Sequence, residues 1–532
     1  MTTVTTATAT AATLAPPRRV SLPAARVLAP AAGAVCTLVL WQIGGRAGWA
    51  DGMIVTPAQA LEPITGDTAE LYRRATFATL GAATRGLVVG SLIAFSAALL
   101  AAGVPVLRRA ISRLAAVANA APWVAVAPCL LVVLGRDRGP AAVAALAVFF
   151  YVFVATSNGL GAAPLASHDV LTALGTSRHR RLVMLQIPGC WPSVVDGLKL
   201  AAPAAVAGAI FGEWYGAPRG LGVLLISAMQ SGRAERLWAA SLLSAAAGLV
   251  AYALLATLRA VMVRRYGASI TQTAERSTAT RPAARTLLVE LVTSLAIGAG
   301  LVLIWFTWIE WADISPLVVP RPSAVWDDLV ATPGDYVSAA FATLVTALVA
   351  LAIGATVALV AAIAASRSRF LSGLVVPIIV VVAATPLVAL LPLLARVFGY
   401  EPGTVRILSA TMVFFPVFVA ARSGLAAAPG AAGDAIHALG AGAGRRFRLL
   451  ELPAAVPHLA SGLRLAAGTA VIAAVVGESL IGRDGLGVEF TLAYRQLDLP
   501  RAFGVAIVIV VVSVTVFALA GIAERAAHRR WV

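Results

Sequence analysis

Residues 169–222 read DVLTALGTSRHRRLVMLQIPGCWPSVVDGLKLAAPAAVAGAIFGEWYGAPRGLG, and residues 434–487 read DAIHALGAGAGRRFRLLELPAAVPHLASGLRLAAGTAVIAAVVGESLIGRDGLG. The two stretches align without a gap at a constant offset of 265 residues, and 22 of the 54 aligned positions are identical. Self-similarity at a fixed offset within one chain indicates that one structural unit occurs twice.

The residues shared by the two copies include charges, glycines and prolines at fixed spacings. Each copy begins with an Asp, followed six residues later by a Gly, and continues with a pair of adjacent Arg residues and then a Pro. It ends with a Glu inside an apolar run and a Gly-Leu-Gly turn. A shorter match lies upstream, where Phe77-Ala78-Thr79-Leu80 recurs at 341–344. The duplication therefore extends beyond the opening stretch and divides the chain into two similar halves.

The composition is typical of a membrane protein. Of 532 residues, 60% are hydrophobic and 12% are charged, which is more apolar surface than a soluble chain of this length can bury. The formal net charge of +17 comes from arginine, because Lys199 is the single lysine. The arginines flank apolar segments and do not gather with aromatic residues on a polar face, so we expect a lipid bilayer around the chain and no nucleic acid partner.

Six apolar segments in each half are long enough to cross the roughly 30 Å hydrocarbon layer of a bilayer. The predicted spans are 28–45, 76–104, 114–134, 140–160, 193–215 and 236–262, then 286–309, 338–365, 371–397, 404–425, 457–481 and 501–523. Arginines concentrate in the loops that are cytoplasmic if the N-terminus lies inside, and an even number of spans then places the C-terminus inside as well. Two halves of six spans each have the same orientation, related by an axis along the membrane normal.

The predicted fold class is therefore an all-α polytopic membrane protein with about 12 transmembrane helices, arranged as two parallel six-helix repeats. The predicted domains are a cytoplasmic N-terminal tail at 1–27, a first repeat at 28–263, a polar cytoplasmic linker at 264–285 and a second repeat at 286–532.

The duplicated stretches resemble the cytoplasmic EAA loop of binding-protein-dependent ABC importer permeases. In that family E-A-A-x-x-x-G is followed, about a dozen residues later, by an apolar residue and Pro. Asp169 and Asp434 stand where the family usually has Glu, and the Gly and Pro anchors are present in both copies. The neighbouring Gly-Leu-Lys/Arg-Leu-Ala, Gly-Glu and Gly-Leu-Gly sequences are similar to the nitrate/sulfonate/taurine branch of the family.

The resemblance implies two ABC importer permease units fused in one chain of a bacterial cell (inner) membrane. It also implies two cytoplasmic ABC ATPase subunits docked on the two loops, an extracytoplasmic substrate-binding protein, and a small oxyanion such as nitrate, a sulfonate or taurine as the solute. The chain lacks the G-x-x-x-x-G-K-[ST] motif that cradles ATP phosphates. We therefore expect no enzymatic activity in this chain and ATP hydrolysis in a partner subunit.

The expected ATPase-coupling residues belong to the two duplicated loops. They are Asp169, Ala173, Gly175, Arg180, Arg181 and Pro188 in the first loop, and Asp434, Ala438, Gly440, Arg445, Arg446 and Pro453 in the second. The glycines are expected where a short basic helix turns, and the prolines are expected to stop that helix from continuing. A short helix fixed at both ends could be moved by a partner as a rigid lever. The alternative is an ordinary cytoplasmic loop whose basic residues face lipid headgroups.

Five further residues are candidates for the solute pathway or its gate, namely Glu213, Glu478, Trp123, Thr385 and Arg85. Glu213 and Glu478 lie late in apolar spans, so they either face the pathway near its outer gate or cap a helix break at the headgroup boundary. Trp123 and Thr385 adjoin prolines that break the third spans, and they either line a cavity or mark a packing kink. Arg85 has no charged counterpart in the second half, and it either attracts an anionic solute or snorkels toward headgroups.

No metal or cofactor site is predicted, because the three cysteines and five histidines lack ligand spacing. One alternative function is a 12-span secondary transporter driven by an ion gradient, with Glu213 or Glu478 carrying protons. That class would have inverted three-span repeats and a long central loop, whereas the strongest repeat here lies between the fourth and fifth spans. An intramembrane enzyme would need paired catalytic residues, which the sequence lacks.

Overall fold

The computed structural model describes residues 23–49, 54–104, 134–162, 165–266, 302–311, 319–368, 397–428 and 430–531, with isolated positions between these ranges (52, 111–112, 115, 127, 130–131, 299–300, 313, 315, 371–373 and 394–395). Within these residues every regular element is helical. The predicted linker at 264–285 lies almost entirely outside them.

The first half begins and ends with a long helix, and its short helices lie between the long ones. Its elements are α1 (Pro23–Arg46), α2 (Pro57–Thr65), α3 (Ala69–Gly103), α6 (Gly139–Gly161), α7 (Leu165–Ala173), α8 (Arg178–Arg181), the π-helical turn η1 (Leu182–Gln186), α9 (Ile187–Trp214), α10 (Leu221–Ser231) and α11 (Ala234–Tyr266).

The second half repeats this order. Its elements are α13 (Pro322–Ala331), α14 (Pro333–Arg367), α17 (Pro402–Ala426), α18 (Gly430–Ala438), α19 (Ala443–Arg446), η3 (Phe447–Glu451), α20 (Leu452–Ile481), α21 (Leu486–Arg495) and α22 (Leu499–Trp531). Even the five-residue π turns recur, which confirms that the duplicated sequence builds one structural unit twice.

Eight helices of the described residues are long and apolar enough to cross a membrane. They are Ala69–Gly103, Gly139–Gly161, Arg178–Trp214 and Ala234–Met262, then Pro333–Arg367, Pro402–Ala426, Ala443–Ile481 and Leu499–Arg530. The first predicted span corresponds to α1, and the described part of the seventh contains the apolar helix Val302–Trp311. Most of the predicted third spans, 114–134 and 371–397, lies outside the described residues. The all-helical, two-repeat fold class is confirmed.

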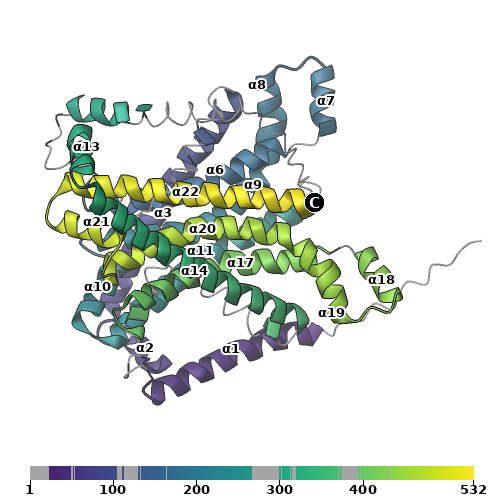
Figure 1. Ribbon diagram of the computed structural model, residues 1–532, viewed down its shortest axis with the longest axis horizontal. Coiled ribbons are helices and arrows are strands. Elements are labelled where there is room, and N and C mark those ends of the chain that lie inside the picture. Colours follow the sequence, from purple (N-terminus) through teal and green to yellow (C-terminus); the bar gives the residue numbers. More distant parts are fainter. Residues whose placement is uncertain are drawn as a thin grey trace, which may run out of the picture.

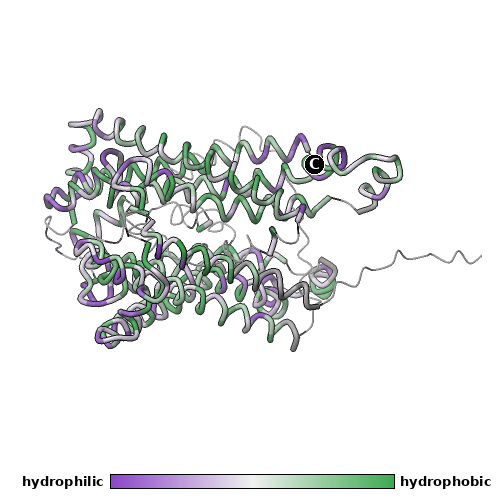
Figure 2. Tube along the Cα trace, turned by 90° about the horizontal axis from the view of Figure 1, so that it is seen from below, coloured by the Kyte–Doolittle hydropathy of each residue, from purple (hydrophilic) through white to green (hydrophobic). Residues whose placement is uncertain are grey.

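The short helices gather at two opposite ends of the molecule. Figure 1 places the pair α7 and α8 and the separate pair α18 and α19 on the same side of the molecule, on the right in this view, which we call the hairpin end. It places α2, α10, α13 and α21 at the other, which we call the turn end. Figure 2 shows hydrophilic segments at both ends and hydrophobic residues along the long helices between them. The two repeats therefore point the same way.

Close helix packing within each repeat depends on small residues at equivalent positions. A Cβ on Gly197 of α9 would lie 2.5 Å from the Cβ of Ala155 in α6. In the second repeat, a Cβ on Gly462 of α20 would lie 2.4 Å from the Cβ of Ala420 in α17. Small residues let membrane helices approach each other and gain contact between their backbones. The duplication has thus kept the tightest contact of each helix pair.

An ion pair joins the fifth and sixth spans of each repeat, but with opposite polarity. Asp196 of α9 pairs with Arg259 of α11 at 2.5 Å. In the second repeat, Arg464 of α20 pairs with Glu524 of α22 at 2.8 Å. Arg259 and Glu524 occupy equivalent positions at the 265-residue offset. A charge of either sign is accepted at this position provided that the neighbouring helix supplies the opposite one, so the contact itself is what the fold requires.

Candidate functional site

Two helical hairpins, α7 with α8 and α18 with α19, lie at the hairpin end. In each hairpin the first helix is closed by a glycine in the left-handed conformation. Gly175 has φ +71° and Gly440 has φ +74°. The N–H of Thr176 donates to the carbonyl of Leu171 at 3.0 Å, and the N–H of Ala441 donates to that of Ile436 at 3.2 Å. This six-to-one hydrogen bond around a left-handed residue is the Schellman motif, which favours glycine because a Cβ is disfavoured there. The glycines therefore turn the chain sharply, where the sequence placed the end of the short helix.

The expectation that Pro188 and Pro453 stop the helix is wrong. A continuous helix runs from Arg178 to Trp214 and another from Ala443 to Ile481. Each proline lies in the first turn of the α-helical part, directly after a π turn. The π turn is wider than an α turn, which relieves the clash between a proline ring and the carbonyl one turn back.

The continuous helices also change the position of the basic residues. The first-loop arginines begin the long helix and do not belong to the short one. Arg181 donates from this first turn to the hydroxyl of Thr172 on α7, which fixes the hairpin internally. Arg180 and its counterpart Arg445 are exposed to solvent. Asp169 and Asp434, on the short helices, are exposed as well.

Each hairpin is tied to the neighbouring long helix of its own repeat. Arg178 donates to the carbonyl of Ala102, near the end of α3, at 2.9 Å. In the second repeat, Glu451 pairs with Arg446 at 3.1 Å and with Arg367, the last residue of α14, at 3.3 Å. A displacement of either hairpin would therefore act directly on α3 or α14.

The hairpin tips present an apolar residue that the sequence reasoning missed. Leu174 is 72% exposed and Leu439 is 85% exposed. Both belong to the duplicated Ala-Leu-Gly sequence, in which Ala173 and Ala438 are exposed too. The signal was the identity of this tripeptide in the two copies. A leucine held in solvent at the same place in both repeats is a candidate contact for a partner.

At the turn end, Glu213 joins three segments of the first repeat. The hydroxyl of Thr79 in α3 donates to Glu213 Oε1 at 2.8 Å. The N–H of Gly222, at the start of α10, donates to Glu213 Oε2 at 2.8 Å. The N–H of Leu221 donates to the hydroxyl of Thr79 at 2.9 Å. We call this arrangement the glutamate clip, and it closes α9 and α10 onto α3.

The second repeat contains the same glutamate clip. Thr343 of α14 donates to Glu478 Oε2 at 2.8 Å and accepts from the N–H of Leu486 at 2.8 Å. The N–H of Gly487 donates to Glu478 Oε2 at 3.1 Å. Both glutamates are buried, with 2% of Glu213 and 4% of Glu478 exposed. Each carboxylate accepts hydrogen bonds within its own repeat, as expected of a group that caps a helix break. A role of either glutamate in the solute pathway stays a prediction.

The first glycine of each Gly-Leu-Gly turn makes room for the carboxylate. Gly220 has φ +146° and Gly485 has φ +105°, a backbone conformation that side chains rarely adopt. A Cβ on Gly220 would lie 2.1 Å from the carboxyl carbon of Glu213, and one on Gly485 would lie 2.5 Å from that of Glu478. The Gly-Glu and Gly-Leu-Gly sequences therefore form a single structural unit.

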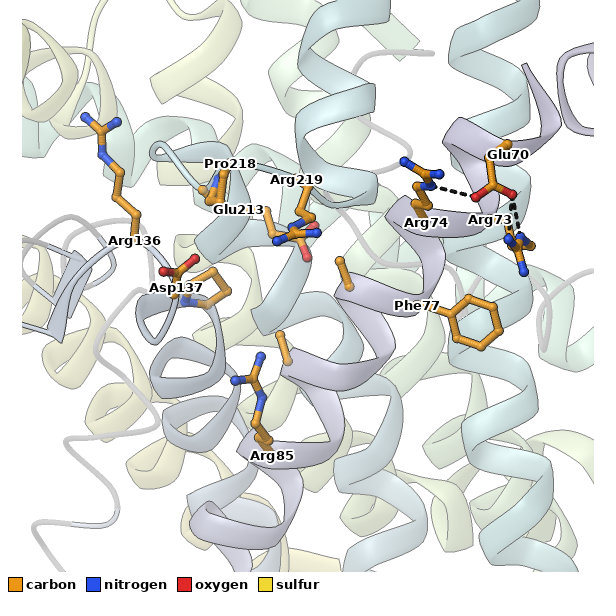
Figure 3. A pocket seen from close by; sticks show the side chains of 14 residues that line it. Glu70, Arg73, Arg74, Phe77, Arg85, Arg136, Asp137, Glu213, Pro218 and Arg219 are labelled. Carbon is orange, nitrogen blue, oxygen red and sulfur yellow. Dashed lines mark hydrogen bonds and ion pairs between the residues drawn. The ribbon is translucent and has the colours of Figure 1, made fainter. Parts of the chain in front are cut away.

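The remaining pathway candidates are placed only in part. Trp123 and Thr385 lie outside the described residues. Arg85 is exposed on α3, and its Nε donates to the carbonyl of Gly81 at 3.1 Å. It lines a cleft of about 740 Å³ at the turn end, which Figure 3 shows from close by.

An aromatic contact at the turn end joins the two repeats. Tyr215, which directly follows α9, meets Tyr494 of α21 edge-on, with ring centroids 6.1 Å apart. Burial and the neighbouring Tyr494 raise the pKa of Tyr215 well above its usual range, so its hydroxyl stays neutral. The sequence comparison could not single out these residues, because the aligned residues are Leu480 and Met229.

The described residues contain no group of three or more His, Cys, Asp or Glu side chains that could hold a metal ion. Cys36 is exposed and Cys190 is buried, and each is a free thiol. Cys129 lies outside the described part of the chain.

The fold and its two hairpins define a helical membrane protein built from two fused copies of one unit. Comparison with known families finds the Binding-protein-dependent transport system inner membrane component twice, at residues 86–272 and 354–531. The chain therefore belongs to this family, as an ABC transporter permease component of a binding-protein-dependent importer with two permease units.

Several named transport permeases that resemble this chain are about as long as one half of it. A probable ABC transporter permease protein of Haemophilus influenzae is 30% identical over 229 residues, which is 43% of this chain and 94% of that protein. The formylaminopyrimidine transport permease protein ThiX of Halalkalibacterium halodurans is 28% identical over 35% of this chain and 74% of its own length. The taurine transport system permease protein TauC of Escherichia coli is 28% identical over 41% of this chain and 83% of its own length.

Proposed function

We propose that this chain forms the complete translocation pathway of an ATP-driven importer in a bacterial inner membrane, with both termini in the cytoplasm. The support is the presence of two permease units in one chain and their common orientation (Figure 1). In this proposal the hairpin end is cytoplasmic and the turn end is extracytoplasmic. The arginines of both hairpins agree with this orientation, because basic residues concentrate in cytoplasmic loops.

The observation that carries the coupling proposal is the pair of equivalent hairpins with exposed leucines at one end of the molecule. Two cytoplasmic ATPase subunits would each receive one tip, with Leu174 or Leu439 as the apolar contact. The arginines around each tip would meet acidic groups of the partner. Force would pass from the tips into α3 and α14 through the contacts of Arg178 and Glu451.

The turn end is where a substrate-binding protein would dock in this proposal. The glutamate clips fix the position of α10 and α21 there, and the contact of Tyr215 with Tyr494 links the repeats. We propose that Glu213 and Glu478 act on the gate by holding these short helices and not by binding solute. Their hydrogen bonds within each repeat support this role.

The solute class that we propose is a small oxyanion such as nitrate, a sulfonate or taurine. Similarity to the taurine permease of Escherichia coli supports this class, as does similarity to the nitrate import permease protein NrtB of Synechocystis. Family membership speaks against an ion-gradient-driven carrier. The two mechanisms differ in their energy source, so uptake into vesicles separates them: importer activity should persist with an uncoupler and stop without the ATPase.

The coupling proposal is tested by placing a charge at the tips. Leu174→Glu and Leu439→Glu should abolish co-purification with the ATPase and ATP-dependent uptake, while the protein still inserts into the membrane. Leu497→Glu is the matched control, because Leu497 is 76% exposed but lies after α21 at the turn end. ATPase binding that survives both tip variants would contradict the proposal, and so would an equal loss of ATPase binding in the control.

A further inference from the structure

The cleft at the turn end of the first repeat is unusually rich in arginine. It has a volume of about 740 Å³ and is formed by the outer part of α3, the turn before α6 and the loop between α9 and α10. The arginines that line it are Arg73, Arg74, Arg85, Arg136 and Arg219. Figure 3 shows Arg85, Arg136 and Arg219 on three different segments of the cleft, with the side chain of Arg136 extended away from the other two.

Two of these arginines share an acidic partner, and the other three form no ion pair with any described residue. Arg73 and Arg74 are both paired with Glu70, at 2.6 Å each. No ion pair forms at Arg85, Arg136 or Arg219 within the part of the chain that the structure describes. The cleft therefore holds three guanidinium groups without an ion pair among the described residues, and one of them, Arg85, donates only its Nε to the carbonyl of Gly81.

The cleft also contains acidic residues, but within the described residues no ion pair joins them to Arg85, Arg136 or Arg219. The carboxylate of Glu213 is engaged by Thr79 and by the N–H of Gly222 in the glutamate clip. Asp137 lines the cleft, but no ion pair to it forms within the described residues. In the second repeat the aligned Glu401 pairs with Arg483 at 2.5 Å, so the corresponding corner there is neutral.

The free arginines are not needed to build the fold. At the aligned positions the second repeat has Val349 for Arg85, Tyr400 for Arg136 and Asp484 for Arg219. The same helices and the same glutamate clip form there without any of the three. A duplicated scaffold that folds with valine, tyrosine and aspartate at these places has no structural requirement for arginine.

The position of Arg85 makes a free guanidinium costly unless it meets an anion. Arg85 lies sixteen residues after Ala69, so about 24 Å from the start of α3 at 1.5 Å per residue. An arginine inside an apolar span is costly unless its charge is compensated. Arg136 reaches the loop of Arg219, because its Nε lies 4.0 Å from the Cβ position of Gly216. Guanidinium groups from three segments line this one cleft, and each offers the paired N–H donors that suit the planar or tetrahedral oxygens of an oxyanion.

We propose that this cleft binds an oxyanion group between Arg85, Arg136 and Arg219, and that only the first repeat has this site. The ligand is either the phosphate of an anionic phospholipid headgroup or a soluble oxyanion, because both offer the same chemistry. The site goes beyond the proposed function, because it lies within one repeat and does not depend on the energy source of transport.

The experiment uses the purified full chain and has one arm for each source of the anion. In the lipid arm, native mass spectrometry compares retained phosphatidylglycerol with retained phosphatidylcholine. In the soluble arm, calorimetry measures sulfate binding to the chain in phosphatidylcholine nanodiscs. The test variant is Arg85→Val with Arg219→Asp, which introduces the residue types that the second repeat carries. Arg483→Gln is the matched control, because it removes an arginine from the corresponding corner of the second repeat.

We expect the double variant to lose at least about tenfold in affinity in one of the two arms, because it removes two guanidinium groups that would donate charge-assisted hydrogen bonds to the anion. The control should keep wild-type binding. A loss in the lipid arm identifies a phospholipid headgroup, and a loss in the sulfate arm identifies a soluble oxyanion. Unchanged binding in both arms, or no binding by the wild type, would overturn the proposal. If the double variant does not fold, Arg85→Gln with Arg219→Gln replaces it.

The outcome is separable from that of the proposed function. The variants leave both hairpins intact, so co-purification with the ATPase should be unchanged whether or not the anion site exists. Loss of ATPase binding by the tip variants, in turn, has no bearing on the cleft.

Discussion

The hydroxyl of Thr79 should be required for the stability of the first repeat. It is fully buried and lies within hydrogen-bonding distance of both oxygens of Glu213, at 2.8 and 3.0 Å. It also accepts the N–H of Leu221 at 2.9 Å. Thr79→Val keeps the shape of the side chain but removes every one of these bonds. Leu221 then has a buried donor without an acceptor, and Glu213 loses its side-chain donor.

The size of the effect follows from these two losses. A buried unsatisfied N–H costs about 1–3 kcal/mol, and a hydrogen bond to a charged group contributes about 1.5–3 kcal/mol. Since the two losses share one cluster and are not additive, we expect Thr79→Val to lower the free energy of unfolding by about 3–5 kcal/mol. Thr79→Ser keeps the hydroxyl and loses one methyl group, which should cost about 1 kcal/mol.

The second repeat provides an internal comparison for the same measurement. Thr343 bonds one oxygen of Glu478, and the other oxygen has no hydrogen-bond partner among the described residues. We therefore expect a smaller loss for Thr343→Val than for Thr79→Val. Reversible unfolding in mixed SDS micelles, followed by tryptophan fluorescence, measures all of these variants. Equal stability of Thr79→Val and wild type, or equal losses for the valine and serine variants, would refute the reasoning.

Three further predictions concern the duplicated contacts. Glu524→Arg should destabilise the protein by about 1.5–3 kcal/mol because it opposes Arg464, and adding Arg464→Glu should restore stability; failure of this exchange in SDS unfolding would count against a direct pair. Gly220→Ala should prevent correct folding, since its Cβ would overlap the carboxyl group of Glu213, and monodisperse protein on size exclusion would contradict this. Gly175→Leu should reduce ATP-dependent uptake without loss of membrane insertion, because leucine disfavours φ +71°; wild-type uptake would refute the lever.

Much of the architecture could be predicted because the duplication supplied an internal alignment. Apolar length located eight of the described spans, and the repeated glycines marked the turns at Gly175 and Gly440. The glutamate clip was not predicted, because Thr79 and Glu213 are 134 residues apart in the chain. The signal was nevertheless present, since Thr79 belongs to the Phe-Ala-Thr-Leu sequence that recurs at 341–344.

Two other features could not be predicted from identity and residue type alone. The rule that proline ends a helix failed at Pro188, where a π turn precedes the proline, and the same helix also continues through Pro192 and Pro203. Membrane helices tolerate proline because neighbouring groups satisfy the freed backbone atoms. The ion pairs of Arg259 and Glu524 escaped notice because a comparison of identities discards positions where the charge inverts. A comparison of charge between the repeats would have found this contact.

The central claim is that two parallel repeats present their hairpins to the same side of the membrane. Ser177 and Gly442 are equivalent exposed positions in the two hairpins. The direct measurement is labelling of Ser177→Cys and Gly442→Cys, each in a chain without other cysteines, by a membrane-impermeant maleimide in right-side-out and inside-out vesicles. We predict that both positions react only in inside-out vesicles. Reaction of one position from each side of the membrane would contradict the account.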